Sequence, residues 1–122
     1  MTLLLTALAG GLGGALRFLV DTGVGRLNRT SLPLGTIVVN ATACLALGLL
    51  TGWALRVDAD GILAVLGVGL LGGYSTFSTA SVEGFRLLRA GRWSAAVVHS
   101  GGMLLISVAT ATVGLLAGSS LA

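Results

Sequence analysis

The stretch Gly72–Glu83 reads GGYSTFSTASVE and interrupts a long apolar run of the chain. Two adjacent glycines followed by Tyr74, Ser75 and Thr76 make a poor helix centre, because glycine is unfavourable inside a helix. The run that contains them, about residues 62–82, is nevertheless long enough to cross a membrane. A broken helix at membrane depth survives only where protein or a water-filled cavity covers its freed carbonyl groups. The stretch therefore predicts a broken membrane helix beside a candidate ion site.

Three other apolar segments of spanning length flank this run, at about residues 3–20, 33–55 and 94–118. The second segment begins at Pro33, a residue that suits the first turn of a helix. The connections between the segments are short, so neighbouring helices are antiparallel. We therefore predict an all-α protein, a single integral membrane domain over residues 1–122 with four transmembrane helices, the third of them broken.

The composition agrees with this fold. The 122 residues are 55% hydrophobic and 9% charged, whereas an ordinary soluble domain is about 25% charged. A soluble chain of this length could not hide so many apolar side chains in a small core. The chain also lacks a pair of buried carboxylates, a nucleophile–histidine–aspartate arrangement and a metal-spaced Cys/His set, which argues against an enzyme.

Small residues four apart predict close helix packing in lipid. Such pairs occur at Gly10/Gly14, Gly48/Gly52 and Gly69/Gly73.

The arginines are distributed unevenly between the connections. The first and third connections carry five of them, and the second carries one: Arg26 and Arg29, then Arg86, Arg89 and Arg92, against Arg56. The positive-inside rule places the first and third connections in the cytoplasm, so both termini should face outward. Because these arginines lie between apolar runs, we interpret the net charge of +3 as a topology signal and predict no nucleic-acid partner.

The residues after the two glycines could bind a small anion. Hydroxyl donors occur from Ser75 to Ser81, and the ring edge of Phe77 carries partial positive charge. A strongly hydrated anion needs such donors in place of its water, as in other channels. The alternative is that these hydroxyls bond back to their own helix and Phe77 only packs.

Three stretches resemble motifs of the fluoride channel (Fluc, or CrcB) family. Gly72–Glu83 resembles the family's third-helix signature GGxTTFSTFxxE. Gly13–Arg17 (GGALR) resembles its first-helix glycine, alanine and arginine pattern, and Pro33–Asn40 (PLGTIVVN) resembles its PxGTxxxN pattern. Together with the length and the helix count, the resemblance covers essentially the whole chain.

The resemblance implies a passive fluoride channel in the bacterial cell membrane, built as an antiparallel dimer of four-helix subunits. It implies that Asn40 lines the fluoride pathway and that the ring edge of Phe77 contacts the ion. Thr76 and Ser78 would contribute to a polar track. Arg17 would either attract anions or anchor its helix at the headgroups.

The resemblance further implies a structural sodium ion at the dimer centre, held by the backbone carbonyls of Gly72 and Ser75. Two other ionisable residues have more ordinary interpretations. We expect Glu83 to cap the third span and face water, and His99 to form a helix–helix hydrogen bond.

The chain departs from the family pattern at three positions. Ser75 stands where the family has the first threonine, Ala80 where it has a second phenylalanine, and Met103 where it has a serine after the residue equivalent to His99. These losses suggest an incomplete pore in this subunit alone. Since the arginine bias favours one orientation, we expect the antiparallel partner to be an oppositely oriented paralogue.

Two alternatives remain. The chain could be a non-conducting assembly subunit of a heterodimeric channel. A small multidrug exporter is disfavoured, because such exporters need an acidic residue in the first helix and none precedes Asp21 here.

Overall fold

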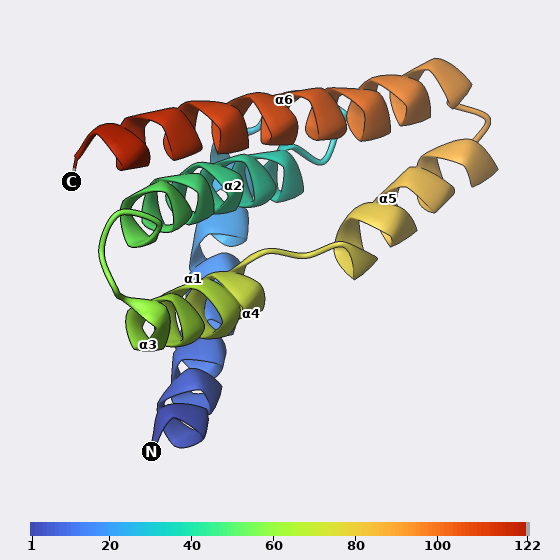
Figure 1. Cartoon of the computed structure of the whole chain (residues 1–122). Coiled ribbons are helices and arrows are strands. Elements are labelled where there is room, and N and C mark those ends of the chain that lie inside the picture. Colours follow the sequence, from blue (N-terminus) through green and yellow to red (C-terminus); the bar gives the residue numbers. More distant parts are fainter. Residues whose placement is uncertain (122) are drawn as a thin grey trace.

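The computed structural model describes residues 1–121, and every regular element among them is a helix. The first, second and fourth spans are single helices, and the third is built from four consecutive pieces. In chain order the elements are α1 (Thr2–Leu27), α2 (Leu34–Ala54), α3 (Asp60–Ile62), η1 (Leu63–Leu71), α4 (Gly72–Tyr74), α5 (Ser78–Arg89) and α6 (Trp93–Ser120) (Figure 1). Four segments are long and apolar enough to cross a membrane, which confirms the predicted fold class.

Two helices extend beyond the apolar runs that predicted them. The first continues past residue 20 to Leu27, and the third span continues past residue 82 to Arg89. Each stops at a residue with a local reason to leave the helix. Asn28 accepts a hydrogen bond from the Thr30 amide at 2.9 Å, which forms a turn typical of asparagine. Gly91 follows α5 with φ of 74°, a left-handed conformation that favours glycine.

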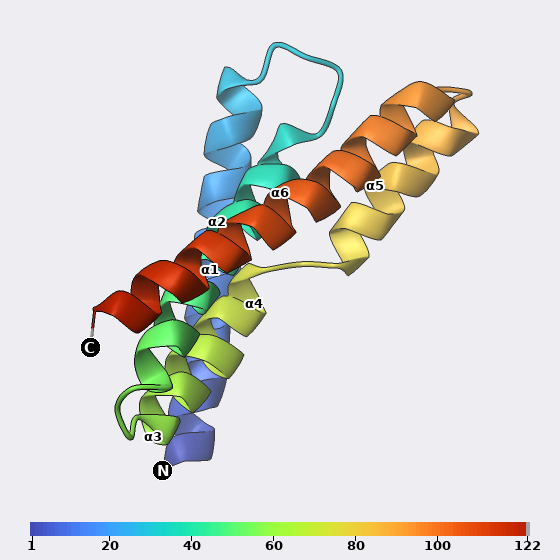
Figure 2. The same cartoon turned by 45° about the horizontal axis from the view of Figure 1, so that its top comes forward.

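The helices α2 and α6 pack along a seam of four glycines, Gly48, Gly52, Gly114 and Gly118. A Cβ at Gly48 would overlap the carbonyl oxygen of Ala111, and one at Gly118 would overlap that of Leu49. Small residues allow this backbone-to-backbone approach, which drives helix association where lipid replaces water. The two helices lie side by side in both ribbon views (Figures 1 and 2). The predicted role of Gly48 and Gly52 in packing is confirmed.

A second glycine contact joins α1 to η1 and α4. A Cβ at Gly73 would overlap the carbonyl oxygen of Gly10, and one at Gly13 would overlap that of Leu70. In contrast, a Cβ at Gly10 or Gly14 would find space, with its nearest neighbours at 3.6 Å and 4.0 Å. The residue of α1 that must be small is therefore Gly13, not the pair predicted from its spacing.

η1 is a π-helix of nine residues, Leu63–Leu71, placed directly before the glycines. π-Helical turns are rare, and those known lie mostly at functional sites. The apolar run of this segment predicts a helix but not its wider turn.

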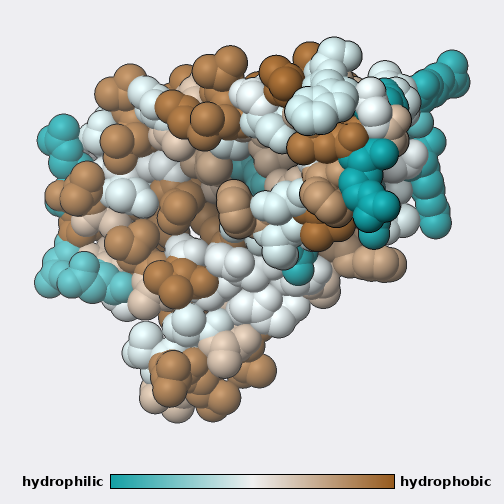
Figure 3. Space-filling model, turned by 90° about the vertical axis from the view of Figure 1, so that its right-hand side faces the viewer, coloured by the Kyte–Doolittle hydropathy of each residue, from teal (hydrophilic) through white to brown (hydrophobic). Residues whose placement is uncertain are grey.

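The outer surface and the two ends of the bundle fit a membrane protein. Figure 3 shows hydrophobic side chains over the middle of one face and hydrophilic ones toward its edges. Arg92, in the third connection, donates to the Ser31 carbonyl oxygen in the first connection at 3.3 Å. The arginine-rich connections therefore meet at one end, opposite both termini (Figure 2).

Candidate functional site

The third span breaks at residues 75–77. Gly72–Tyr74 remain helical as α4, and the chain becomes extended at Ser75, with φ of −73° and ψ of 160°. The break thus lies just after the two glycines, rather than at them as the sequence suggested. Gly73 is required for the close contact with α1, which holds α4 as a helix up to that point.

Asn40 of α2 holds the broken backbone in place. Its Oδ1 accepts a hydrogen bond from the Thr76 amide at 2.9 Å, and its Nδ2 donates to the Thr76 carbonyl at 2.7 Å. One side chain thereby replaces both backbone partners that Thr76 loses when the helix ends. Because buried peptide groups without partners are costly in a membrane, this pairing is what allows the break to persist.

Other carbonyl groups at the break stay available. Among residues 1–121, the carbonyls of Gly72, Gly73 and Tyr74 accept no hydrogen bond. The Ser75 carbonyl accepts a long one, 3.4 Å, from Arg17 Nη1 of α1. The break therefore presents a group of carbonyl oxygens that could hold a small cation.

Several hydroxyls near the break bond locally. Thr76 Oγ1 accepts from the Thr79 amide at 3.2 Å and lies 3.4 Å from Ser78 Oγ, and Ser81 Oγ donates to the Phe77 carbonyl at 2.9 Å. The Thr76 bond lies just before α5, and the Ser81 bond runs back along the first turn of α5 itself. The interpretation in which hydroxyls bond back to their own helix is right for Ser81.

A cavity of about 390 Å³ lies against the break, between α2, α5 and α6. It brings together Asn40, Thr76 and Phe77 of the predicted pathway, and Ser75 also lines it. Ala80 and Met103, the two departures from the family pattern, also line it, as do Ser100 and Ser107 of α6. Phe77 is 86% exposed, so its ring is free to face an ion or a partner.

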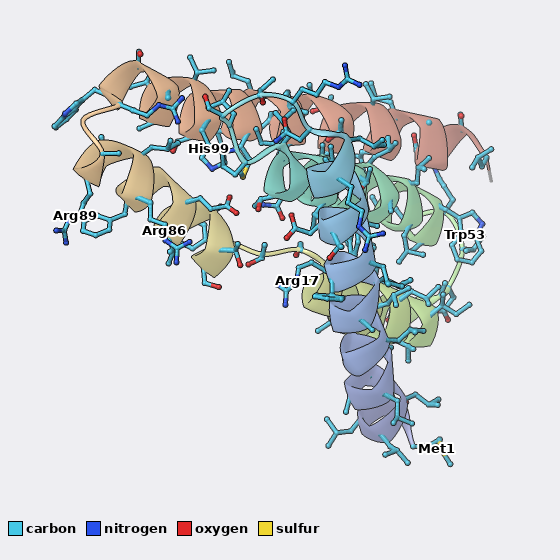
Figure 4. All side chains as sticks on the ribbon, turned by 180° about the vertical axis from the view of Figure 1, so that it is seen from behind. Met1, Arg17, Trp53, Arg86, Arg89 and His99 are labelled. Atoms are coloured by element: carbon cyan, nitrogen blue, oxygen red, sulfur yellow. The ribbon has the colours of Figure 1, made fainter. Side chains whose placement is uncertain are left out.

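A smaller cavity of about 230 Å³ lies on the other side of Thr76, between α1 and α2. Arg17 and Asp21 line it with Thr36 and Thr79. Thr76 lines both cavities and so stands between them. Arg17 lines this cavity and lies beside α4 (Figure 4). Ser78 lines neither cavity and reaches the site only through Thr76.

Two residues have surroundings that the sequence did not predict. Glu83 is half-buried in the middle of α5, where its Oε1 accepts a hydrogen bond from Thr36 Oγ1 at 2.8 Å. The expectation that it caps the span and faces water is wrong. His99 is fully buried and its Nε2 lies 3.5 Å from Glu83 Oε2, but within residues 1–121 neither ring nitrogen makes a hydrogen bond. The expected hydrogen bond is replaced by an electrostatic contact between α6 and α5.

The sequence carried one signal for this cluster, because ionisable residues inside a span are expensive and usually functional. It could not reveal that Thr36, Glu83 and His99 meet, since they come from three different helices.

Comparisons with known proteins agree with the motifs. The family model described as "CrcB-like protein, Camphor Resistance (CrcB)" matches residues 4–119. The chain is 40% identical over 121 residues to fluoride-specific ion channel FluC 2 of Cutibacterium acnes, covering 98% of each chain. It is 39% identical to FluC 1 of Leifsonia xyli subsp. xyli, over 94% of this chain and 85% of that protein. It is 43% identical to FluC of Methylobacterium nodulans over 81% of each.

Proposed function

This chain belongs to the CrcB-like family, and on that premise we propose that it is a subunit of a fluoride-specific ion channel that exports fluoride passively from the cytoplasm. The observation that carries the proposal is the cavity beside the helix break, where Asn40, Thr76 and Phe77 meet. Fluoride enters cells from acidified surroundings as the neutral weak acid, dissociates and is trapped as the anion. A selective channel gives it an exit and so lowers its toxicity.

Asn40 can contact the ion and still keep both of its hydrogen bonds to the Thr76 backbone. Its Nδ2 makes a second contact, 3.2 Å to Met103 Sδ, in addition to its bond to Thr76. A thioether sulfur is a weak acceptor, so an anion can replace it at little cost. The ring edge of Phe77 would supply partial positive charge to the same ion, and Arg17 in the neighbouring cavity would attract it.

A second subunit would complete the pathway. α5 stands away from α1 and α4 (Figure 1); Phe85 is exposed on it, and Phe77 is exposed directly before it. Since lipid cannot satisfy polar backbone at a break, protein or a water-filled cavity must cover this side. We infer an antiparallel dimer, as the family resemblance implies. The five-to-one arginine bias supports an oppositely oriented paralogue as the partner, and it supports an orientation in the bacterial cell membrane with both termini outside.

The carbonyls at the break fit the proposed structural sodium ion. The Gly72 carbonyl is free of hydrogen bonds among residues 1–121, and the Ser75 carbonyl has only its long contact to Arg17. Hard cations take oxygen ligands, and usually about six or more for calcium. Because this chain supplies two carbonyls, the remaining ligands would come from the partner. A bound cation would stabilise the carbonyl dipoles gathered at the dimer centre.

The second candidate function is that of a non-conducting assembly subunit. Ala80 and Met103 line the cavity where the family pattern has a ring and a hydroxyl. Their presence favours this alternative, in which the partner subunit supplies the conducting pore.

Fluoride efflux from liposomes tests the proposal. The chain is reconstituted alone and together with an oppositely biased paralogue from the same genome, with protein-free liposomes and chloride efflux as controls. Fluoride-selective efflux only in the mixed preparation supports a heterodimer, and efflux from the chain alone would contradict it. If neither preparation conducts fluoride while a known FluC does, the proposed function is wrong.

The mixed preparation also separates the two candidate functions. Phe77→Leu and Asn40→Ala, introduced into this chain but not into its partner, should reduce efflux if the pathway of this chain conducts. Unchanged efflux would support the assembly subunit.

A further inference from the structure

His99 is a buried polar side chain without a hydrogen-bonding partner. It is 0% exposed, it lines the cavity that contains Asn40 and Phe77, and within residues 1–121 neither of its ring nitrogens makes a hydrogen bond. Buried polar groups in native proteins are nearly always paired, so each exception calls for an explanation. A ligand that enters the cavity would provide one.

Glu83 decides which nitrogen is available for that ligand. Its Oε1 is occupied by Thr36, and its Oε2 lies 3.5 Å from His99 Nε2. Nε2 is thus the ring nitrogen beside the carboxylate, and Nδ1 has no partner among residues 1–121. In the neutral ring only one nitrogen carries a proton, whereas the imidazolium donates from both.

We propose that His99 is an additional anion-binding residue of this channel, with its imidazolium held by Glu83 through Nε2 and donating from Nδ1 to fluoride in the cavity. The inference rests on the proposed function and deepens it. It adds a charged donor to the α6 wall of the cavity, where Ser100 and Ser107 also lie and where Met103 offers no donor. A small hard anion suits the site, because it gains most from a charge-assisted hydrogen bond.

The ionisable groups around the pair come from three helices. Glu83 and Arg86 belong to α5, and Asp21 of α1 lies near Glu83. Cys44 of α2 lines the same cavity as His99. Since only the imidazolium donates from both ring nitrogens, fluoride efflux through this subunit should be greater at low pH than at high pH.

The first experiment measures fluoride efflux against pH, in whichever pairing conducts, for the wild type and His99→Gln. Protein-free liposomes correct for leakage of the neutral acid at each pH. We expect wild-type efflux to fall several-fold from the acidic to the alkaline end of the series and the His99→Gln profile to be flat. A flat wild-type profile, or an unchanged slope in His99→Gln, would overturn the proposal.

The second experiment does not depend on a folded variant. The chain contains a single histidine, so labelling histidine with ¹⁵N in this subunit alone reports on His99 alone. Adding sodium fluoride to the wild-type protein should shift the imidazole signals, and sodium chloride at the same concentration should not. Absence of a fluoride-specific shift would contradict the assignment of His99. If the shift occurs but no preparation conducts, the site binds the anion and the channel proposal fails on its own.

Discussion

The seam between α2 and α6 and the break at residues 75–77 are built on opposite principles. At the seam, glycines bring two helix backbones together, and each helix satisfies its own peptide groups. At the break, the backbone leaves the helix and depends on one side chain, Asn40, for its partners. The seam is apolar and closely packed, whereas the break adjoins two cavities whose largely apolar walls include polar side chains.

The difference shows how a small membrane protein combines a stable frame with an ion pathway. α2 serves both regions, because Gly48 and Gly52 pack against α6 while Asn40, two turns earlier, reaches the break. Rigid packing of α2 therefore positions the amide that holds Thr76. Substitutions at the seam should lower stability first, and substitutions at the break should lower conduction first.

The largest loss of stability is expected at the seam. In Gly118→Ala, the new Cβ would overlap the Leu49 carbonyl, and overpacking of this kind costs about 1–3 kcal/mol. The midpoint of thermal denaturation in detergent measures the effect. Gly102→Ala on the same helix is the matched control, because a Cβ there meets nothing within 4 Å. Equal midpoints for the two variants would show that the seam is not closely packed.

An intermediate loss is expected at Asn40. Asn40→Leu keeps the size of the side chain but leaves the amide and carbonyl of Thr76 unpaired, which costs about 1–3 kcal/mol. Fluoride efflux should fall at least about tenfold, since each 1.4 kcal/mol of lost positioning is a factor of ten.

The control for this variant is Thr42→Val, on the same helix. It removes the exposed hydrogen bond between Thr42 Oγ1 and Tyr74 Oη, which is 2.8 Å long. Both the stability and the fluoride efflux of this variant should stay near wild type. If Asn40→Leu conducts fluoride at the wild-type rate, the backbone conformation at the break does not depend on the Asn40 amide.

The helical fold was largely predictable from the sequence, because membrane spans can be recognised by their length and composition. The four spans, the break in the third and the packing role of Gly48 and Gly52 all follow from local patterns. The exact place of the break did not, since it depends on the contact between Gly73 and Gly10 across two helices. The π-helical turn of η1 depends in the same way on its neighbours.

Residues of the site could be predicted only where they belong to one of the three sequence motifs. Asn40, Thr76 and Phe77 do meet at one cavity, and Arg17 faces the next. The motif did not indicate that Asn40 binds the backbone of Thr76, because that pairing appears only when α2 and the break are placed side by side. Glu83 and His99 were assigned separate, ordinary roles, since nothing in their spacing shows that α5 and α6 bring them within 3.5 Å.

The smallest effect on stability, and the sharpest separation of the two regions, is expected at Phe77. Its ring is 86% exposed in the single subunit, so Phe77→Leu removes few contacts. The free energy of unfolding should therefore change by less than about 0.5 kcal/mol, with little shift in the denaturation midpoint. The loss of an aromatic edge from the pathway should nevertheless reduce fluoride efflux strongly, because leucine offers no partial positive charge to an anion. Phe85→Leu is the control: it lies on α5, which begins directly after Phe77, and is also exposed, but it is outside the residues that line the cavity. If the two variants lose efflux equally, Phe77 acts through subunit contact rather than through the ion, and the break would be a second packing surface instead of a pathway.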